Sequence, residues 1–189
     1  MPLEQNVQPP KHENPLVEGL KTIGLSLVLA FGIRTAVAQS YFIPSGSMEP
    51  TLEIDDRLIV DKVSYRFTTP QRGDIVVFNP PEAVIKEENL HDPFIKRVIG
   101  LPGEKVEVKG GRVYINNVPL REDYIADKPN YTWEPHIVPP NSYLVLGDNR
   151  NNSYDGHYWG FVARDRIIGR AVVRFWPLNR MGGFPEEQQ

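Results

Sequence analysis

The sequence predicts a mostly β protein, in which an antiparallel β-sheet domain with a hairpin extension follows one N-terminal transmembrane helix. Three observations support this fold class. Short apolar and β-branched runs bounded by turn residues recur from residue 57 onward. No stretch beyond the first 40 residues has a sustained helical period. One long apolar run, residues 16–38, precedes the first strand, and 189 residues suit one domain plus an anchor.

The expected strands are residues 57–60, 74–78, 94–99, 143–146 and 167–175. The clearest hairpin alternates over residues 105–109, turns at Gly110-Gly111 and returns over residues 112–115. We place it in an extension around residues 104–140. Residues 82–92, which are acidic, and 127–140, which are rich in proline, are expected to be loops.

The N-terminal region predicts a single-pass anchor. Residues 1–15 are polar, contain four prolines and are expected to form a disordered tail. Residues 16–38 approach the ~20 apolar residues that a spanning helix needs, although Lys21 and Arg34 interrupt them. Lys11 and Lys21 precede the apolar core, whereas residues 39–56 contain no basic residue. This asymmetry predicts a cytoplasmic N-terminus and places the β-domain, residues 39–189, on the extracytoplasmic side of the cell membrane.

An alternative for the same segment is a cleaved secretory signal. Ala36-Val37-Ala38 has the small-x-small form of a cleavage site. Arg34 is charged where such a signal is neutral, and a serine-rich turn follows within a few residues. The retained anchor is therefore favoured, and whether the chain is cut at Ala38 stays open.

Composition excludes several classes of partner and chemistry. The net charge of -3 and the lack of a basic stripe argue against a nucleic-acid partner. The chain has no cysteine, which excludes disulfides, a cysteine nucleophile and thiolate metal sites.

The first candidate for a reactive site is residues 44–52, Pro-Ser-Gly-Ser-Met-Glu-Pro-Thr-Leu. Pro44 and Pro50 restrict the backbone, and Gly46 permits shapes that a side chain forbids. This pattern would present the hydroxyl of Ser47 on a rigid exposed turn. The competing interpretation is a polar linker between an anchor and a domain.

A serine nucleophile needs a base, and two candidates follow from the residues. One is a triad of Ser47, His157 and Asp155. Against it, Asp155 and His157 are two residues apart and would lie side by side on one face of a strand. Lys96 is the other and the favoured one, because a strand over residues 94–99 places it on the same face as the apolar Phe94 and Val98. Burial there disfavours the ammonium form and lowers the lysine pKa. Arg97 would point to the opposite face in a structural role.

Three stretches in order resemble the type I signal peptidases, which are membrane-anchored serine proteases with a Ser–Lys dyad. They are residues 44–52, 94–103 (Phe-Ile-Lys-Arg-Val-Ile-Gly-Leu-Pro-Gly) and 147–155 (Gly-Asp-Asn-Arg-Asn-Asn-Ser-Tyr-Asp). The resemblance implies that Ser47 is the nucleophile and Lys96 the general base. It implies an oxyanion hole from the Ser47 N–H and the Ser45 hydroxyl. It further implies that Ser153 orients the lysine ammonium and that Asp155 supports the site, with residues 147–152 as scaffold.

The resemblance also implies a substrate pocket for the side chains one and three residues before the cut, lined by Ile43, Pro44, Met48, Leu52, Val77 and Ile95. It implies no metal and no cofactor; the partners are exported preproteins and the lipid bilayer. Two positions depart from the pattern, since some family members carry Asp where Asn151 stands and Ser-Arg where Gly156-His157 stands. The departures place the support around Asp155 in doubt but leave the dyad intact.

The function implied is a membrane-bound serine endopeptidase that cleaves signal peptides from exported preproteins after small-x-small motifs. A Ser–Lys self-processing regulator is one alternative, and the anchor argues against it. A non-catalytic membrane-anchored binding domain is another, and it would not need both Ser47 and Lys96. The sequence does not indicate the role of residues 82–92, and a thylakoid membrane is an alternative location.

Overall fold

The computed structural model describes residues 15–184, apart from the side chains at positions 30, 31 and 33–36. The chain divides into two compact units, Met1–Ala36 and Val37–Gln189. The predicted tail, except for Pro15, lies outside the described residues.

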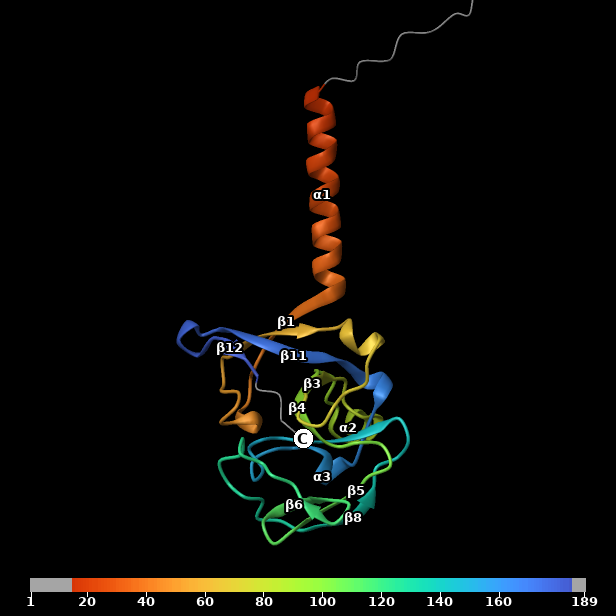
Figure 1. The fold of residues 1–189 in the computed structure, drawn as a ribbon, viewed down its shortest axis with the longest axis vertical. Coiled ribbons are helices and arrows are strands. Elements are labelled where there is room, and N and C mark those ends of the chain that lie inside the picture. The colour runs from red at the N-terminus through yellow and green to blue at the C-terminus, as the bar shows by residue number, and fades with distance from the viewer. Residues whose placement is uncertain (1–14, 185–189) are drawn as a thin grey trace, which may run out of the picture. The chain divides into compact units, whose positions relative to one another are not determined.

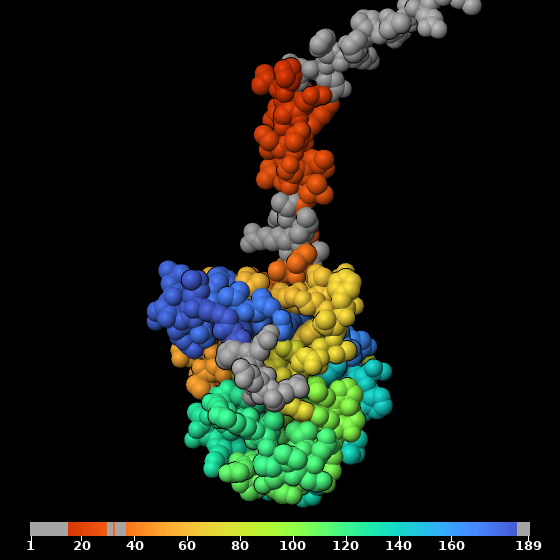
Figure 2. Space-filling model, in the orientation of Figure 1, coloured from red at the N-terminus to blue at the C-terminus, as the bar shows by residue number. Residues whose placement is uncertain are grey.

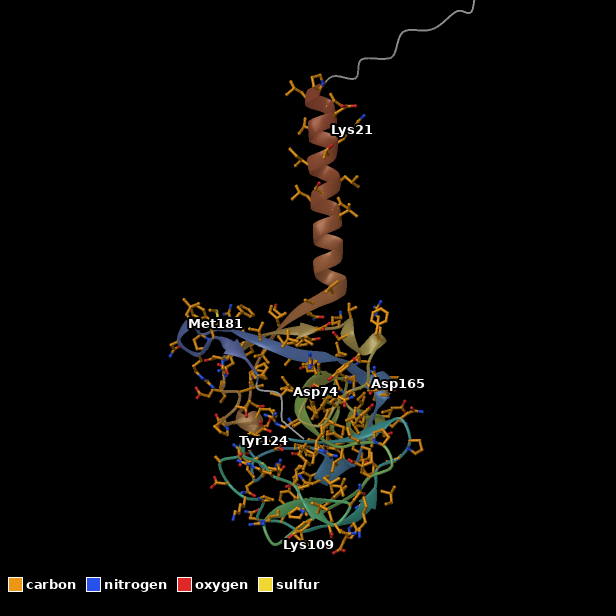
Figure 3. The ribbon with its side chains drawn as sticks, in the orientation of Figure 1. Lys21, Asp74, Lys109, Tyr124, Asp165 and Met181 are labelled. Carbon is orange, nitrogen blue, oxygen red and sulfur yellow. The ribbon has the colours of Figure 1, made fainter. Side chains whose placement is uncertain are left out.

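The first unit contains the helix α1, Pro15–Val37 (Figure 1). A helix therefore covers the predicted segment. The predicted transmembrane helix is not confirmed, because no helix among the described residues combines the length and hydropathy that crossing a bilayer requires. Glu18 and Lys21 lie in its first two turns, and Figure 3 labels Lys21 on its flank.

The second unit is built on an antiparallel sheet of eight strands, in the order β1-β2-β11-β3-β4-β9-β10 with β12 paired to β11. The long β11 crosses the sheet and pairs with both β2 and β3 (Figure 1). The strands are β1 (Ala38–Phe42), β2 (Arg57–Asp61), β3 (Ile75–Phe78), β4 (Phe94–Gly100), β9 (Ser142–Leu146), β10 (Val162–Ala163), β11 (Ile167–Trp176) and β12 (Gly182–Gly183).

A second, four-stranded antiparallel sheet has the order β7-β6-β5-β8. Its strands are β5 (Lys105–Lys109), β6 (Arg112–Ile115), β7 (Val118–Pro119) and β8 (Trp133–Ile137). They lie within the predicted extension and include the predicted hairpin. In Figure 2 their green surface forms one end of this unit.

Short helices fill the connections. They are η1 (Gly46–Met48), η2 (Ser64–Arg66), α2 (Glu82–Glu88), α3 (Gly156–Trp159), η3 (Arg164–Arg166) and η4 (Leu178–Arg180).

The large sheet is buried on both faces around β3. Ile75 and Val77 pack with Ile43, Met48 and Leu52 on one face, whereas Val76 and Phe78 pack with Val98 on the other. Burial of both faces explains why β3 is uniformly apolar instead of alternating. A third cluster joins the two sheets, with Ile99, Leu144 and Leu146 against Val106, Val108 and Val113.

The mostly antiparallel β class, the five strand runs and the hairpin are confirmed, and two expected loops are wrong. Residues 82–92 contain α2, which buries Val84 and is too short to show a helical period in the sequence. Residues 127–140 contain β8, which pairs with β5 at the edge of the small sheet. An edge strand tolerates Pro135 and leaves its side chains mostly exposed, so it lacks the alternation that predicts strands.

Candidate active site

Ser47 lies in the single turn η1, which follows β1 and is tied down on both sides. The flanking Met48 and Leu52 are fully buried in the core. The carbonyl of Ser47 accepts a hydrogen bond from Asn149 N at 3.1 Å, and Asn149 Nδ2 donates to the carbonyl of Gly46 at 3.0 Å. The turn therefore holds the Ser47 side chain, which is 9% exposed, in a fixed place.

Lys96 comes from the middle of β4 and reaches the same turn. Its Nζ lies 2.9 Å from Ser47 Oγ and donates to the carbonyl of Ile95 at 2.9 Å. As predicted, Lys96 shares a strand face with Phe94 and Val98, and its partner across the ladder is the buried Val76. Its nitrogen is 5.7 Å from the centre of the Phe94 ring.

This environment changes the protonation of Lys96. Burial lowers the pKa of its amino group to about 8 from the ordinary 10.5, and the negative charges of Asp155 and Asp148 act in the opposite direction. At pH 7 about a tenth of the amine is therefore neutral, far more than for an ordinary lysine, and a neutral amine can accept a proton.

The turn formed by residues 147–152 supports Ser47 and Lys96 through a buried ion pair. Asp148 is fully buried and accepts two hydrogen bonds from Arg97, from Nε at 2.8 Å and from Nη2 at 2.6 Å. Thr51 Oγ1 donates to the same carboxylate at 2.5 Å. Arg97 follows Lys96 in β4, and Thr51 lies just beyond η1, so the ion pair joins β4, the η1 segment and the turn. This contact confirms the predicted structural role of Arg97.

A second buried pair connects this turn to the extension. Arg150, which is 1% exposed, contacts Glu122 at 2.5 Å. Tyr124 lies between them and the first pair, with its ring centre 4.0 Å from the Arg97 guanidinium and 5.9 Å from that of Arg150. Figure 3 labels Tyr124 between the two sheets. No motif in the sequence indicates this link.

Gly147 and Ser153, which belong to the third motif, pack against Ser47. A Cβ on Gly147 would overlap both Ser153 Oγ and the carbonyl oxygen of Ser47, so the close approach requires glycine. Ser153 Oγ is buried and has no hydrogen-bond partner in the described part of the chain. The structure thus brings Ser153 to the site, but the hydrogen bond to Lys96 that the resemblance implied is absent among these residues.

Asp155 and His157 are arranged differently from the strand pair considered above. Asp155 caps the short helix α3 and accepts from the backbone N–H of His157 at 3.1 Å. His157 Nδ1 lies 2.7 Å from the same oxygen. The hydrogen-bonding neighbours of Ser47 Oγ are Lys96 and, at 3.5 Å, Ser45 Oγ, so the geometry favours the lysine over the triad.

Comparison with known proteins agrees with this arrangement. The family described as "Signal peptidase, peptidase S26" matches residues 16–176. The chain belongs to this signal peptidase family.

Its relatives include proteins of cyanobacteria and a plant. It is 63% identical over 183 residues to "Signal peptidase I" of Leptolyngbya laminosa. The aligned residues cover 96% of this chain and 90% of that protein. It is 59% identical over 170 residues to "Probable signal peptidase I-2" of Synechocystis sp., covering 90% and 78%. It is 38% identical over 168 residues to "Thylakoidal processing peptidase 1, chloroplastic" of Arabidopsis thaliana, covering 87% of this chain and 49% of that one.

The predicted substrate pocket of this signal peptidase chain divides into two groups. Ile43, Met48, Leu52 and Val77 are between 0% and 2% exposed and belong to one core cluster. Pro44 is exposed and Ile95 is partly buried. If the six residues line a pocket, the four core side chains would form its floor, and Pro44 and Ile95 are the two that are accessible.

Proposed function

We propose that this chain is a serine endopeptidase that removes N-terminal signal peptides from exported preproteins. The observation that carries the proposal is the 2.9 Å approach of a buried lysine amine to Ser47 Oγ, in a chain of the signal peptidase family. A binding domain would have no use for a buried lysine with a lowered pKa beside a hydroxyl.

In the proposed mechanism, the neutral amine of Lys96 accepts the proton of Ser47 as its Oγ attacks the scissile carbonyl carbon. The Ser47 N–H and the Ser45 hydroxyl stabilise the oxyanion that forms. The lysine ammonium then gives its proton to the leaving amine of the mature protein. Lys96 next activates a water molecule, which attacks the acyl-enzyme, releases the signal peptide as a carboxylic acid and restores Ser47.

The test of the function is cleavage of a purified preprotein by the full chain in detergent. Wild type is expected to release the mature protein, and Ser47→Ala to abolish release. Ser40→Ala, an exposed serine on β1, is the matched control and is expected to retain full activity. An intact preprotein alongside a self-cleaved chain would favour the self-processing regulator, and binding without cleavage the non-catalytic domain.

The pH dependence of kcat/KM is expected to follow the free Lys96 amine. The deprotonated form is the active one, so kcat/KM should rise about tenfold per pH unit below the midpoint and level off above it. With the pKa of Lys96 at about 8, the midpoint is expected near pH 8. A midpoint near pH 6.5 that disappears in His157→Gln would instead identify a histidine base.

Specificity is expected to follow the small pocket. Preproteins with Ala-x-Ala before the cut should be cleaved. Leucine in place of either alanine should lower kcat/KM by at least about 100-fold, because the close-packed side chains below the pocket cannot move to make room for it. Ile95→Ala should recover part of the loss at one of the two positions. Ile59→Ala, equally half-buried on β2, is the control; recovery there too would contradict the pocket assignment.

We further propose that residues 16–38 anchor the chain in a membrane, with residues 39–189 on the extracytoplasmic side. The support is the helix itself, on which Leu16, Leu20, Leu27 and Val28 are each at least 66% exposed. Apolar side chains that are not covered by protein mark contact with lipid or a partner. Protease added to intact spheroplasts is expected to digest the β-domain and spare an N-terminal tag; a protected β-domain would reverse the orientation.

A further inference from the structure

Asp155 is a fully buried carboxylate at the centre of a small network beside the dyad. Its Oδ2 accepts the N–H of Gly147 at 2.8 Å. Its Oδ1 accepts the N–H of His157 and lies 2.7 Å from His157 Nδ1. Gly147 in turn packs on Ser47 and Ser153. The position of Asp155 therefore fixes the backbone that supports the nucleophile.

The acids nearest to this network have different partners. Asp148 is paired with Arg97 at 2.6 Å and Glu122 with Arg150 at 2.5 Å. Asp155 has no such arginine partner among these contacts; the imidazole of His157 lies 2.7 Å from it, and the side chains of Asp155 and His157 are 0% and 10% exposed. Of the two negative charges that raise the pKa of Lys96, that of Asp155 has the larger effect.

The His157 ring is held in place from both sides. It stacks on Tyr131 at 4.1 Å with an interplanar angle of 11°, and Tyr158 packs on it at 3.9 Å. The loop before β8 that carries Tyr131 is fixed by Asn151, whose Oδ1 accepts from Asn130 N at 2.8 Å and whose Nδ2 donates to the carbonyl of Lys128 at 3.0 Å. A carboxylate at position 151 could make the first bond but not the second.

We propose that His157 is a positioning residue for the reaction, which holds the Asp155 carboxylate on Gly147 and offsets its charge, so that Lys96 can act as a base. The inference rests on the proposed function. The four-stranded sheet contributes through the loop before β8, whose Tyr131 stacks on His157. Without the imidazole donor, the charge of Asp155 acts on Lys96 with less compensation and stabilises its ammonium form. The pKa of Lys96 should then rise, whether the imidazole that was removed was neutral or protonated.

The experiment titrates Lys96 directly in the full chain in detergent, by NMR of lysines labelled at Cε in a Ser47→Ala background. The Lys96 signal is identified by its loss in Lys96→Met. In His157→Leu, the Lys96 titration is expected to move upward by at least about 0.5 pH unit. His157→Asn, whose side-chain amide can place a donor near the position of Nδ1, is expected to restore most of the wild-type value.

Two further variants separate this role from a packing defect. His136→Leu removes another stacked histidine, 4.3 Å from the Trp133 ring, whose Nδ1 lies beside a backbone carbonyl, and should leave the Lys96 titration unchanged. In Asp155→Asn, the further change His157→Leu should produce no upward shift, because the charge has gone. If His157→Leu does not fold, His157→Phe takes its place; it keeps a ring to stack on Tyr131, lacks the donor and adds no charge, so the same upward shift is expected.

A Lys96 titration that stays at its wild-type value in folded His157→Leu, or in its replacement His157→Phe, would overturn the inference, as would an equal shift in His136→Leu. The kcat/KM profile of the active enzyme should move with the titration. Because the titration does not need turnover, failure of the chain to cleave preprotein would count against the proposed function and leave the test of His157 intact.

Discussion

Replacing Lys96 by methionine is expected to lower kcat/KM for preprotein cleavage by about 10⁴-fold, the upper end of what a general base contributes. Methionine keeps the length and the apolar stem of the side chain, so the core cluster that surrounds β4 stays filled. What is lost is the amine 2.9 Å from Ser47 Oγ. The other hydrogen-bonding neighbour of this oxygen, the hydroxyl of Ser45, is no base at neutral pH.

Lys96→Arg should be nearly as damaging, because a guanidinium keeps its proton at any pH at which the protein is folded. The control is Lys86→Met on α2, where the side chain is 76% exposed and full activity is expected. Measurements across the pH range are needed, since a base with a pKa of about 8 contributes most above that pH. More than a few per cent of wild-type activity in Lys96→Met would exclude the lysine as the base.

The burial of Lys96 could be predicted because its signal is local: Phe94 and Val98 share its strand face. Its pairing with Ser47, 49 residues away, was implied by the resemblance that three motifs carry. Apolar and β-branched runs bounded by turn residues predicted the central strands. Such patterns failed at β8, whose exposed side chains reflect its place at an edge, and at α2, whose seven residues complete only two turns.

The support around the dyad has no comparable signal. Asp148 and Arg97 are separated by 51 residues, and Arg150 and Glu122 by 28. Arginine is usually exposed, so nothing near Arg150 in the sequence indicates a side chain that is 1% exposed. Such pairs form only when segments distant in the sequence meet in the fold, and pattern analysis of one segment at a time does not detect them.

The position of His157 shows the same limit. The sequence predicts no element at residues 155 and 157, and their two-residue spacing would place them on one face only if they lay on a strand. Asp155 instead caps α3, and the cap brings the imidazole to its own carboxylate within one helical turn. Aspartate is a preferred N-cap, but a helix of four residues is too short to be recognised from its sequence.

Asp148→Asn is expected to lower the free energy of unfolding by about 3–5 kcal/mol, the usual cost of breaking a buried ion pair from one side. The substitution keeps the size of the side chain and leaves the 4%-exposed guanidinium of Arg97 without its counter-charge. The bonds that Arg97 makes to the carbonyl of Gly73 and the contact with the Tyr124 ring do not replace it. Urea denaturation of the full chain in detergent measures the change.

Asp123→Asn is the matched control, because Asp123 pairs with Arg121 at 2.5 Å while both side chains are more than 70% exposed. Solvent screens such a pair, so its loss should leave the urea midpoint nearly unchanged. Arg97→Met combined with Asp148→Asn should be less destabilised than Asp148→Asn alone, since no uncompensated charge is then buried. Equal midpoints for Asp148→Asn and Asp123→Asn would show that the pair does not hold β4 and the turn together. The placement of Lys96 against Ser47 would then depend on the apolar clusters and on Asn149.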